Sequence, residues 1–306
     1  MRIAVLGAGA LGSVFGGTLA AEIPVTLVGH ENPHLSAILD DGLTIVRPDG
    51  SRERPDIAVT ADHAAVDDAD LVIVAVKSYD TESAMADVAP YLDAVDVLTL
   101  QNGLGNVEAI REVVPENDVL AGTTTNGAYI EQPGVVHHTG WGGTRIGRVW
   151  ARNDAVVDHL AATFRAVGFE TSVERDVERA IWEKVLVNVG INPITALTGV
   201  KNGALVSADA GERLLEAAVR EAEAVANADG HEFRDDPVDT TRRVASETAQ
   251  NHSSMLQDVD KGSRTEIDSL NGAVVDRAAA HGIEVPVNRT LTDAIRLLQS
   301  GPEYKT

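Results

Sequence analysis

A glycine-rich turn close to the N-terminus constrains the fold of this chain more than any other feature. It consists of Gly7-Ala8-Gly9-Ala10-Leu11-Gly12 and lies between an apolar run from Arg2 to Leu6, which predicts a β-strand, and a helical pattern that continues to Ala21. In such a unit the first glycine permits a tight turn, the second lets a pyrophosphate approach the backbone, and the third lets the helix pack on the strand. With a second strand at Val25 to Val28, the pattern is typical of dinucleotide binding, although a plain structural turn would use the same glycines.

Two further predicted strands end in polar residues. Leu71 to Val76 is a continuous apolar run of the kind found in strands buried on both faces of a parallel sheet, and Lys77 follows it. Val97 to Leu100 is similar, and Gln-Asn-Gly-Leu-Gly follows at 101 to 105. Because ligands of open α/β sheets bind at the carboxyl ends of the strands, these polar residues are candidates for a binding site. Lys77 could equally be a surface residue, and Asn102 a turn former.

The end of the second predicted strand leaves the choice of cofactor open. Gly29-His30-Glu31-Asn32 lies where a carboxylate would bind the ribose of NAD, or where a basic group would bind the 2′-phosphate of NADP. His30 could meet a phosphate and Glu31 could meet a hydroxyl. A surface pair that does neither is a third interpretation.

With 306 residues, the chain is long enough for two domains, each with its own core. Residues 1–173 predict a Rossmann-type α/β domain, in which Leu43 to Arg47 and Ile57 to Thr60 form an inserted hairpin around a Pro-Asp-Gly turn at 48 to 50. Later segments are expected to extend its sheet with antiparallel strands, and then to add a helix and a last strand: Leu120–Thr124, Val135–Thr139, Thr144–Gly147, Asp154–Ala166 and Glu170–Val173.

Residues 174–306 show helical patterns only and predict a second, all-helical domain. Beyond its opening helix, further helices are expected at Ala210–Ala228, at Thr240–Ala249, from Arg264 to Ala280 and after Pro286.

A polar stripe interrupts the apolar run that extends from Trp182 to Pro193. Its members, Lys184, Asn188 and Asn192, follow one another at intervals of four residues, which on a helix places them on one face. The other faces carry valine, leucine and isoleucine, which predicts a buried helix. Burying an ammonium group and two amides costs free energy unless they find partners. The stripe is therefore either a satisfied structural network or a ligand site.

The charge balance excludes a nucleic-acid partner. The formal net charge is -22, with 47 acidic against 25 basic residues, so the phosphates of a nucleic acid would be repelled over the whole surface. The acids are scattered and lysines are few, which indicates a halophilic protein from a salt-rich cytosol, where screening weakens self-repulsion.

Composition narrows the remaining classes. The chain contains no run of about 18 apolar residues and no basic leader, so we expect neither a membrane span nor a secretory signal, and we expect a cytoplasmic protein. Cysteine is absent, which excludes disulfides and thiolate catalysis. The nine histidines show no metal-ligand spacing, and the pair His137-His138 lies on a predicted strand whose alternate side chains face opposite ways, so no metal site is expected.

Motifs spread over nearly the whole chain resemble those of the ketopantoate reductase (2-dehydropantoate 2-reductase) family. In the first domain they are Gly-Ala-Gly-Ala-Leu-Gly at 7 to 12, Val-Lys at 76 to 77, Gln-Asn-Gly-Leu-Gly at 101 to 105 and Gly-Thr-Thr-Thr at 122 to 125. In the second they are Trp-Glu-Lys at 182 to 184, Asn-Xaa-Xaa-Ile-Asn-Pro at 188 to 193, Ser-Ser-Met-Leu-Gln-Asp at 253 to 258 and Thr-Glu-Ile-Asp at 265 to 268. The glycine motif alone is generic, but the motifs together, in this order, are specific.

The resemblance implies NADPH-dependent reduction of 2-dehydropantoate to (R)-pantoate, a step toward pantothenate and coenzyme A. It implies that Lys184 is the proton donor. The implied ligands of the keto-acid substrate are Asn102, Lys184, Asn188, Asn192, Asn202 and Ser254. The implied cofactor-binding residues are Gly7, Ala8, Gly9, Ala10, Leu11, Gly12, His30, Lys77, Asn102, Ala128 and Glu266. His30 departs from the family, which commonly carries an arginine for the 2′-phosphate, so NAD remains an alternative to NADP.

Two of these residues have structural interpretations as well. A serine at Ser253-Ser254 can cap a short helix, and Glu266 in a first helical turn can offset the helix dipole. The chemistry is nevertheless coherent, because hydride addition to a ketone develops negative charge on oxygen, which a poised ammonium stabilises and protonates.

Two other functions fit parts of the pattern. One is another NAD(P)-dependent 2-keto acid or 3-hydroxyacid dehydrogenase of the same architecture. The other is a regulator that senses NADPH without turning anything over, which the polar stripe argues against because a sensor needs no proton donor. The oligomeric state is not apparent from the sequence, which is compatible with a homodimer.

Overall fold

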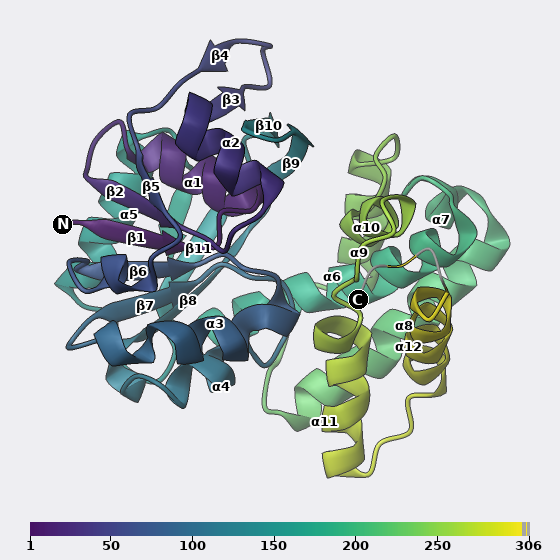
Figure 1. Cartoon of the computed structure of the whole chain (residues 1–306). Coiled ribbons are helices and arrows are strands. Elements are labelled where there is room, and N and C mark those ends of the chain that lie inside the picture. The colour runs from purple at the N-terminus through teal and green to yellow at the C-terminus, as the bar shows by residue number, and fades with distance from the viewer. Residues whose placement is uncertain (302–303, 305–306) are drawn as a thin grey trace. The chain divides into compact units, whose positions relative to one another are not determined.

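The computed structural model describes residues 1–301 and 304, and these form two compact units (Figure 1). The first unit comprises Met1–Gln101 and Asn106–Ala180, and the second comprises Asn102–Gly105 and the described residues from Ile181 onward. The boundary expected from the sequence, near residue 173, is the end of the last strand of the first unit. The helix that follows belongs to both units, because its first turn is tied back to the strands by Arg145, which donates to the carbonyl oxygen of Ala180 at 3.1 Å.

The first unit is built on an eight-stranded sheet. Its strands are β1 (Ile3–Leu6), β2 (Val25–Val28), β5 (Ala58–Thr60), β6 (Leu71–Val74), β7 (Asp96–Thr99), β8 (Val119–Thr124), β11 (Thr144–Arg148) and β12 (Thr171–Val173). They are arranged in the order β12-β11-β8-β7-β6-β1-β2-β5, and the strands from β8 to β5 are all parallel to one another. β1 and β6 are buried along their whole length, as expected for central strands of a parallel sheet. The Rossmann-type α/β fold predicted from the sequence is confirmed.

Helices cover both faces of this sheet. They are α1 (Ala10–Leu19), α2 (Pro33–Asp41), α3 (Thr81–Val88), α4 (Asn106–Arg111) and α5 (Ala155–Ala166), with 3-10 turns at His63–Val66, Ser78–Asp80, Ala89–Tyr91 and Glu116–Asp118. Figure 1 shows α3 and α4 on the opposite face from α1. Asparagine and aspartate set two of the helix starts: Asn32 caps α2 and Asp154 caps α5 by accepting hydrogen bonds from backbone N–H groups of the first turn.

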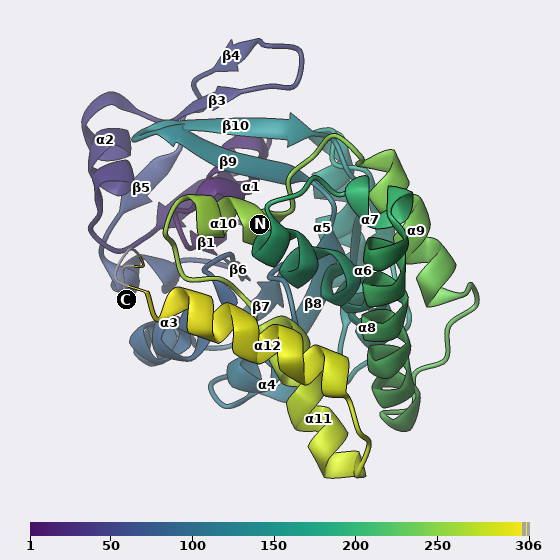
Figure 2. The ribbon, with the colours of Figure 1, turned by 90° about the vertical axis from the view of Figure 1, so that its right-hand side faces the viewer.

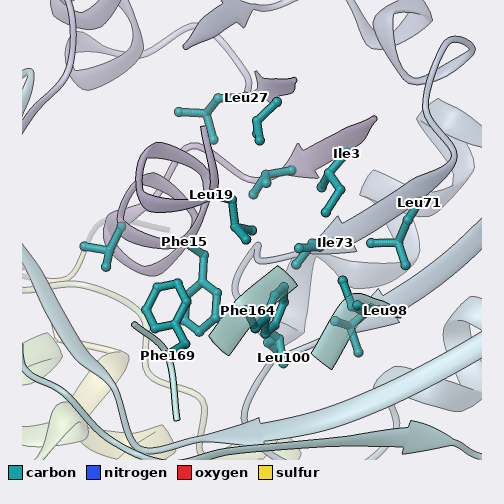
Figure 3. Close-up of a cluster of buried hydrophobic side chains, with 14 of the residues drawn as sticks. Ile3, Phe15, Leu19, Leu27, Leu71, Ile73, Leu98, Leu100, Phe164 and Phe169 are labelled. Atoms are coloured by element: carbon teal, nitrogen blue, oxygen red, sulfur yellow. The ribbon is translucent and has the colours of Figure 1, made fainter. Parts of the chain in front are cut away.

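Aromatic side chains fill the core between α1, α5 and the sheet (Figure 3). Phe15 stacks on Phe169 with 4.3 Å between ring centroids, and Phe164 packs against both rings. All three are fully buried, and burial of each such side chain stabilises the fold by roughly 1.5–3 kcal/mol. The helix that follows the glycine turn is therefore held firmly against the sheet.

A second sheet of four strands corrects two sequence predictions. It has the order β4-β3-β10-β9, as Figure 2 shows, and consists of β3 (Thr44–Val46), β4 (Arg52–Glu53), β9 (Gly127–Gln132) and β10 (Val135–Gly140). The hairpin predicted between 43–47 and 57–60 is wrong in its second strand, because β3 pairs with β4 and β5 joins the main sheet beside β2. Both residues of β4 are exposed, so no apolar pattern marks it.

The other correction concerns the segment at 135–139, which was expected to extend the main sheet. It forms β10, which pairs with β3 and with β9, a strand that the sequence did not indicate. Register shifts between β9 and β10 break the alternation by which strands are recognised. The expected antiparallel extension of the main sheet is made by β11, which pairs with β8.

The second unit is helical throughout its described part. Its elements are α6 (Val177–Thr198), whose first turn belongs to the first unit, α7 (Ala204–Ser207), α8 (Asp209–Ala228), α9 (Pro237–Glu247), α10 (Ser254–Asp260), a π-helical segment at Asp268–Gly272, α11 (Ala273–His281) and α12 (Pro286–Gln299). Its core joins Trp182 and neighbouring apolar residues of α6 to side chains of α8, α11 and α12. A β-carbon on Gly190 would lie 2.6 Å from the Val219 side chain, so this glycine is what allows α6 and α8 to pack closely.

Candidate active site

The glycine turn has the geometry that its sequence predicts. Gly7 has φ +117, and a β-carbon there would lie 2.6 Å from the backbone nitrogen of Val76. A β-carbon on Gly12 would lie only 1.9 Å from the carbonyl oxygen of Gly7. Gly9, in contrast, has no atom within 4 Å of the position that a β-carbon would occupy. The first and third glycines are thus required by the protein itself, whereas the second faces open space at the start of α1, where an anion would meet the N–H groups of the first turn.

A buried histidine, His34, contacts the residue that follows this turn. The backbone N–H of Gly134 donates to Nδ1 of His34 at 3.0 Å, so the neutral ring carries its proton on Nε2, which lies 3.3 Å from the hydroxyl oxygen of Ser13. Burial lowers the pKa of His34 below its ordinary value of 6.5. His34 therefore links α2 and the turn before β10 to the residue that follows Gly12. The sequence carries no signal for this role, since it is a lone histidine on a helix.

The end of β2 lies beside the glycine turn. A β-carbon on Gly29 would lie 2.7 Å from the β-carbon of Ala8, and Gly29 is followed directly by His30 and Glu31, which are both exposed. Asn32 fixes this segment by capping α2 and by donating to the carbonyl oxygen of His30 at 3.1 Å. The two exposed side chains of His30 and Glu31 thus lie at the carboxyl end of β2, beside the glycine turn.

The other cofactor candidates of the first unit lie on two different sheets. Lys77 is half-buried and follows β6 at the edge that carries the glycine turn, where Gln101 links β7 to β6 by donating to the carbonyl oxygen of Val76 at 2.9 Å. Ala128 lies on β9, a strand that contacts α1, and packs against the core of the unit. The roles of Lys77 and Ala128 in cofactor binding remain predictions.

The polar stripe lies on α6, as its spacing predicts. Lys184 and Asn188 are half-buried and Asn192 is buried, while the apolar residues between them pack into the core. The structure brings Asn192 to Ser254, whose hydroxyl oxygen lies 3.4 Å from the amide nitrogen. The polar residues thus reach beyond their own helix to α10.

Capping of α10 is performed by Ser253 and not by Ser254. The hydroxyl of Ser253 accepts from the N–H of Leu256 at 3.1 Å and lies 2.7 Å from the hydroxyl of Thr195. The structural interpretation of this serine pair therefore applies to Ser253, and Ser254 presents its hydroxyl beside Asn192.

Asn202 carries a buried polar atom that the described residues do not satisfy. Its amide nitrogen donates to the hydroxyl of Thr248 at 2.9 Å, and its backbone N–H donates to the carbonyl oxygen of Asn251, which lies in the loop that leads to Ser254. The amide oxygen, however, is buried and has no hydrogen-bond partner among the described residues. Leaving such an acceptor unpaired costs about 1–3 kcal/mol, a cost that a donor reaching this oxygen would remove.

Glu266 and Asn102 also meet directly. Asn102 donates from its amide nitrogen to the Glu266 carboxylate at 3.1 Å, and the carboxylate is buried. Glu266 lies before the π-helical segment and not in a first helical turn, so the dipole interpretation of this acid is wrong, as is the prediction that a regular helix begins near Arg264. The residues of the polar stripe, Asn102, Glu266, Asn202 and Ser254 all belong to the second unit.

Two findings bound the chemistry and the setting of the site. The described residues contain no group of three or more histidine, cysteine, aspartate or glutamate side chains that could hold a metal ion. Within residues 1–301 and 304, no helix is long and apolar enough to cross a membrane.

A parallel sheet with an open glycine turn at its carboxyl edge, joined to a helical unit that bears the polar stripe, defines a dinucleotide-dependent oxidoreductase. Two family models match the chain: Ketopantoate reductase PanE/ApbA over residues 3–150, and Ketopantoate reductase PanE/ApbA C terminal over residues 176–299. The chain belongs to the ketopantoate reductase family.

Relatives along the whole chain agree with this assignment. A 2-dehydropantoate 2-reductase of Halobacterium salinarum is 53% identical over 300 residues, which cover 98% of this chain and 99% of the relative. The structure of a PanE/ApbA family ketopantoate reductase from Ralstonia eutropha JMP134 is similar with a TM-score of 0.91 and 35% identity, covering 98% of this chain and 99% of that one. A ternary structure of D-mandelate dehydrogenase with NADH and anilino(oxo)acetate has the same TM-score at 25% identity, with the same coverage of both chains.

Proposed function

We propose that this chain catalyses the NADPH-dependent reduction of 2-dehydropantoate to (R)-pantoate, a step toward pantothenate and coenzyme A. The observation that carries the proposal is the polar stripe of Lys184, Asn188 and Asn192 on α6, extended by Ser254, in a chain of the ketopantoate reductase family. One ammonium group and several neutral hydrogen-bonding groups are what the reduction of a keto acid requires.

In this mechanism Lys184 acts on the oxygen of the substrate carbonyl. A bound nicotinamide supplies the hydride to the carbonyl carbon. The oxygen then gains the electron pair of the carbonyl bond, and the Lys184 ammonium transfers a proton to it, so that a hydroxyl forms and the amine is left neutral. The amine takes up a proton from water before the next turnover. Asn188, Asn192 and Ser254 hold the substrate without adding a countercharge that would trap it in the ground state.

The unpaired amide oxygen of Asn202 supports 2-dehydropantoate over simpler keto acids. An amide oxygen can only accept a hydrogen bond. The carboxylate and keto groups of a 2-keto acid also only accept, so neither can satisfy it. The terminal hydroxyl of 2-dehydropantoate can donate to it, which would remove the cost of the buried unpaired atom.

For the cofactor we propose NADPH, bound at Gly7 to Gly12 with its 2′-phosphate at His30. Lys77, Ala128, Asn102 and Glu266 complete the proposed cofactor contacts. NAD remains the alternative, because Glu31 beside His30 would suit a ribose hydroxyl.

An absorbance assay of NADPH consumption tests the proposal. We expect turnover with 2-dehydropantoate and a kcat/KM about 10- to 100-fold lower with 3,3-dimethyl-2-oxobutanoate, which differs only in lacking the hydroxyl. The substitution Asn202→Ala should reduce kcat/KM for 2-dehydropantoate and leave the analogue nearly unaffected, so that the two substrates become similar. Equal use of both substrates by the unsubstituted protein would contradict the proposed substrate.

The main rival is a dehydrogenase for other 2-keto acids, and the similarity to D-mandelate dehydrogenase makes benzoylformate with NADH the appropriate competing substrate pair. A higher kcat/KM for that pair would favour the rival. Binding of NADPH without consumption, with any of these keto acids, would instead indicate a sensor.

We further propose that the protein is cytoplasmic and that it acts on its small-molecule substrate either as a monomer or as a homodimer. Light scattering of the purified protein measures its mass and so distinguishes the monomer from the homodimer.

A further inference from the structure

Helix α6 contains a proline directly after the last residue of its polar stripe. Pro193 lies inside the helix, directly after Asn192. In a regular α-helix the N–H of residue 193 would donate to the carbonyl oxygen of Val189, but proline has no N–H, and its ring displaces that carbonyl. The carbonyl group of Val189 thus loses its intrahelical partner at a position where the side chain is fully buried.

The missing donor is supplied by Asn271. Its amide nitrogen donates to the carbonyl oxygen of Val189 at 3.3 Å. Asn271 lies in the π-helical segment Asp268–Gly272, and its side chain is completely buried. Segments of π-helix are uncommon and occur frequently at functional sites.

A chain of hydrogen bonds fixes the orientation of the Asn271 amide. Glu221 and the carbonyl oxygen of Ala218 can only accept, so the amide nitrogen of Asn288, which contacts both at 2.9 Å, must donate to them. The oxygen of Asn288 then faces Asn271, whose amide nitrogen donates to it at 2.9 Å. The same nitrogen is therefore the group that faces Val189. The proline break, by which we mean the position between Val189 and Pro193 where the helical hydrogen bond is missing, is thus anchored to α8 and α12.

The amide of Asn271 is retained at a cost. Its oxygen is buried without a hydrogen-bond partner among the described residues, which costs about 1–3 kcal/mol. A leucine of nearly the same shape would avoid this cost and would suit the surrounding core. The useful group at this position is therefore the N–H donor.

The proline break lies between the members of the polar stripe. Lys184 and Asn188 precede Val189, whereas Asn192 follows it and contacts Ser254. Beyond the break, Thr195 contacts Ser253, so the second part of α6 is tied to the start of α10. Because a proline inside a helix tends to kink it, the backbone geometry at residues 189 to 193 sets how Lys184 and Asn188 are directed relative to Asn192.

We propose that Asn271 is a positioning residue for the reaction: its hydrogen bond to Val189 holds the proline break of α6 and so aligns Lys184 and Asn188 with Asn192 and Ser254. The effect on turnover rests on the proposed function, whereas the hydrogen bond itself does not. Asn271 belongs to none of the motifs by which the chain resembles its family.

A double-mutant cycle tests this assignment with Asn271→Leu, Pro193→Ala and the combined variant. Alanine at 193 restores an N–H that can donate to Val189, so the amide becomes dispensable in that background. We expect Asn271→Leu alone to lower kcat/KM about tenfold through a raised keto-acid KM and a lowered kcat, and to leave NADPH affinity unchanged. In the Pro193→Ala background the same substitution should cost less than about threefold.

Unfolding measurements make the test independent of the reaction. The loss of melting temperature caused by Asn271→Leu should also be smaller in the Pro193→Ala background. As a control, Thr292→Val removes a buried hydroxyl that donates to the carbonyl oxygen of Asn288, and its effect should be the same in both backgrounds. If Asn271→Leu alone does not fold, recovery of folding in the combined variant supports the proposal, and Asn271→Ala replaces leucine in the kinetic cycle.

Equal losses from Asn271→Leu in the two backgrounds, in both stability and kcat/KM, would overturn the assignment. A wild-type protein that does not reduce 2-dehydropantoate would instead refute the proposed function, and the coupling in melting temperature would still decide whether Asn271 replaces the donor that Pro193 removes.

Discussion

The imidazole of His34 donates from Nε2 to the hydroxyl oxygen of Ser13 at 3.3 Å, while its Nδ1 accepts from the backbone N–H of Gly134 at 3.0 Å. Ser13 directly follows the glycine turn in α1, so one neutral ring connects the end of this turn to α2 and to the start of β10. A second proton on this ring would replace the acceptor at Nδ1 with a donor that faces another donor.

This relationship predicts a loss of stability at mildly acid pH. Burial lowers the folded-state pKa of His34 below 6.5, so the unfolded chain binds more protons than the folded chain in this pH range. The contribution of His34 to the free energy of unfolding is therefore fully present above pH 6.5 and is lost as the pH drops below that value. The pKa of His138 is lowered in the same direction, mainly by burial and then by Arg47. Asp49, Asp154 and Asp236 have pKa values below their ordinary 3.8 and contribute only at lower pH.

Melting temperatures between about pH 7 and pH 5 measure this effect. His34→Gln can keep both hydrogen bonds without titrating. It should reduce the pH dependence of the free energy of unfolding by an amount that corresponds to up to about one bound proton. His159→Gln, at an exposed position of α5, serves as the control. An unchanged slope in the His34 variant would show that its titration is not linked to folding.

The three glycines of the turn predict two different phenotypes. Gly12→Ala should destabilise the first unit, because its β-carbon would lie 1.9 Å from the carbonyl oxygen of Gly7. Gly9→Ala should fold normally, since nothing lies within 4 Å, but should lose NADPH affinity by about 100-fold because the methyl group occupies the proposed pyrophosphate position. Melting temperature and fluorescence titration with NADPH distinguish the two. Wild-type NADPH affinity in Gly9→Ala would contradict the proposal that the pyrophosphate binds at this turn.

The parts of the fold that sequence reasoning predicted are those in which one local pattern determines the result. The buried strands β1 and β6 are uninterrupted apolar runs. Helix α8 begins one residue before its predicted start and ends at its predicted last residue. The second sheet was missed because pairing between β3 and β10 joins segments distant in the sequence, and because β4 is too exposed to show a pattern. Strand partners are tertiary information that short-range patterns do not carry.

The candidate site divides in the same way. The spacing of Lys184, Asn188 and Asn192 predicts a shared helix face, and the structure confirms that they lie on one helix, α6. The packing of residues 102–105 with the second unit could not be predicted, since it depends on a hydrogen bond between Asn102 and Glu266 and on the N–H of Leu104, which donates to the carbonyl oxygen of Ser269 at 2.8 Å. The roles of Lys184, Asn188 and Asn192 in the reaction stay predictions that substitutions can test.

The exposed pair after β2 predicts a modest cofactor preference. His30 is the basic group of this segment, and Glu31 beside it would oppose a phosphate. We expect NADPH to be preferred over NADH by about tenfold in kcat/KM, or ~1.4 kcal/mol. His30→Arg should widen the preference, because a guanidinium binds a phosphate bidentately, and Glu31→Gln should widen it as well by removing the opposing charge. More efficient use of NADH by the wild type would refute the assignment.

The net charge of -22 predicts that salt stabilises the fold. Salt also weakens attractive pairs, such as those of Arg242 with Glu212 and Glu216, but surface pairs contribute little, whereas repulsion among excess acids acts over longer distances. At about 1 M salt the Debye length falls to about 3 Å, so the melting temperature should rise steeply between dilute buffer and molar KCl. Sucrose, which strengthens burial without screening, is the control. Full stability and activity in dilute buffer would contradict a halophilic adaptation.

Substitution of Lys184 tests the central chemical assignment. Lys184→Ala should lower kcat by roughly 10²- to 10⁴-fold, the usual range for loss of a general acid, while NADPH affinity and melting temperature stay near those of the wild type. A lysine that merely satisfied a structural network would behave differently, because its loss would destabilise the fold and would impair cofactor binding together with turnover. Asn188→Ala is the companion variant from the same helix face, and its loss should be mainly in keto-acid KM, since an amide that holds the substrate also contributes to ground-state binding. Near-wild-type kcat of Lys184→Ala at saturating keto acid would end the assignment of Lys184 as proton donor, and the proton would then have to come from water or from another group in the second unit.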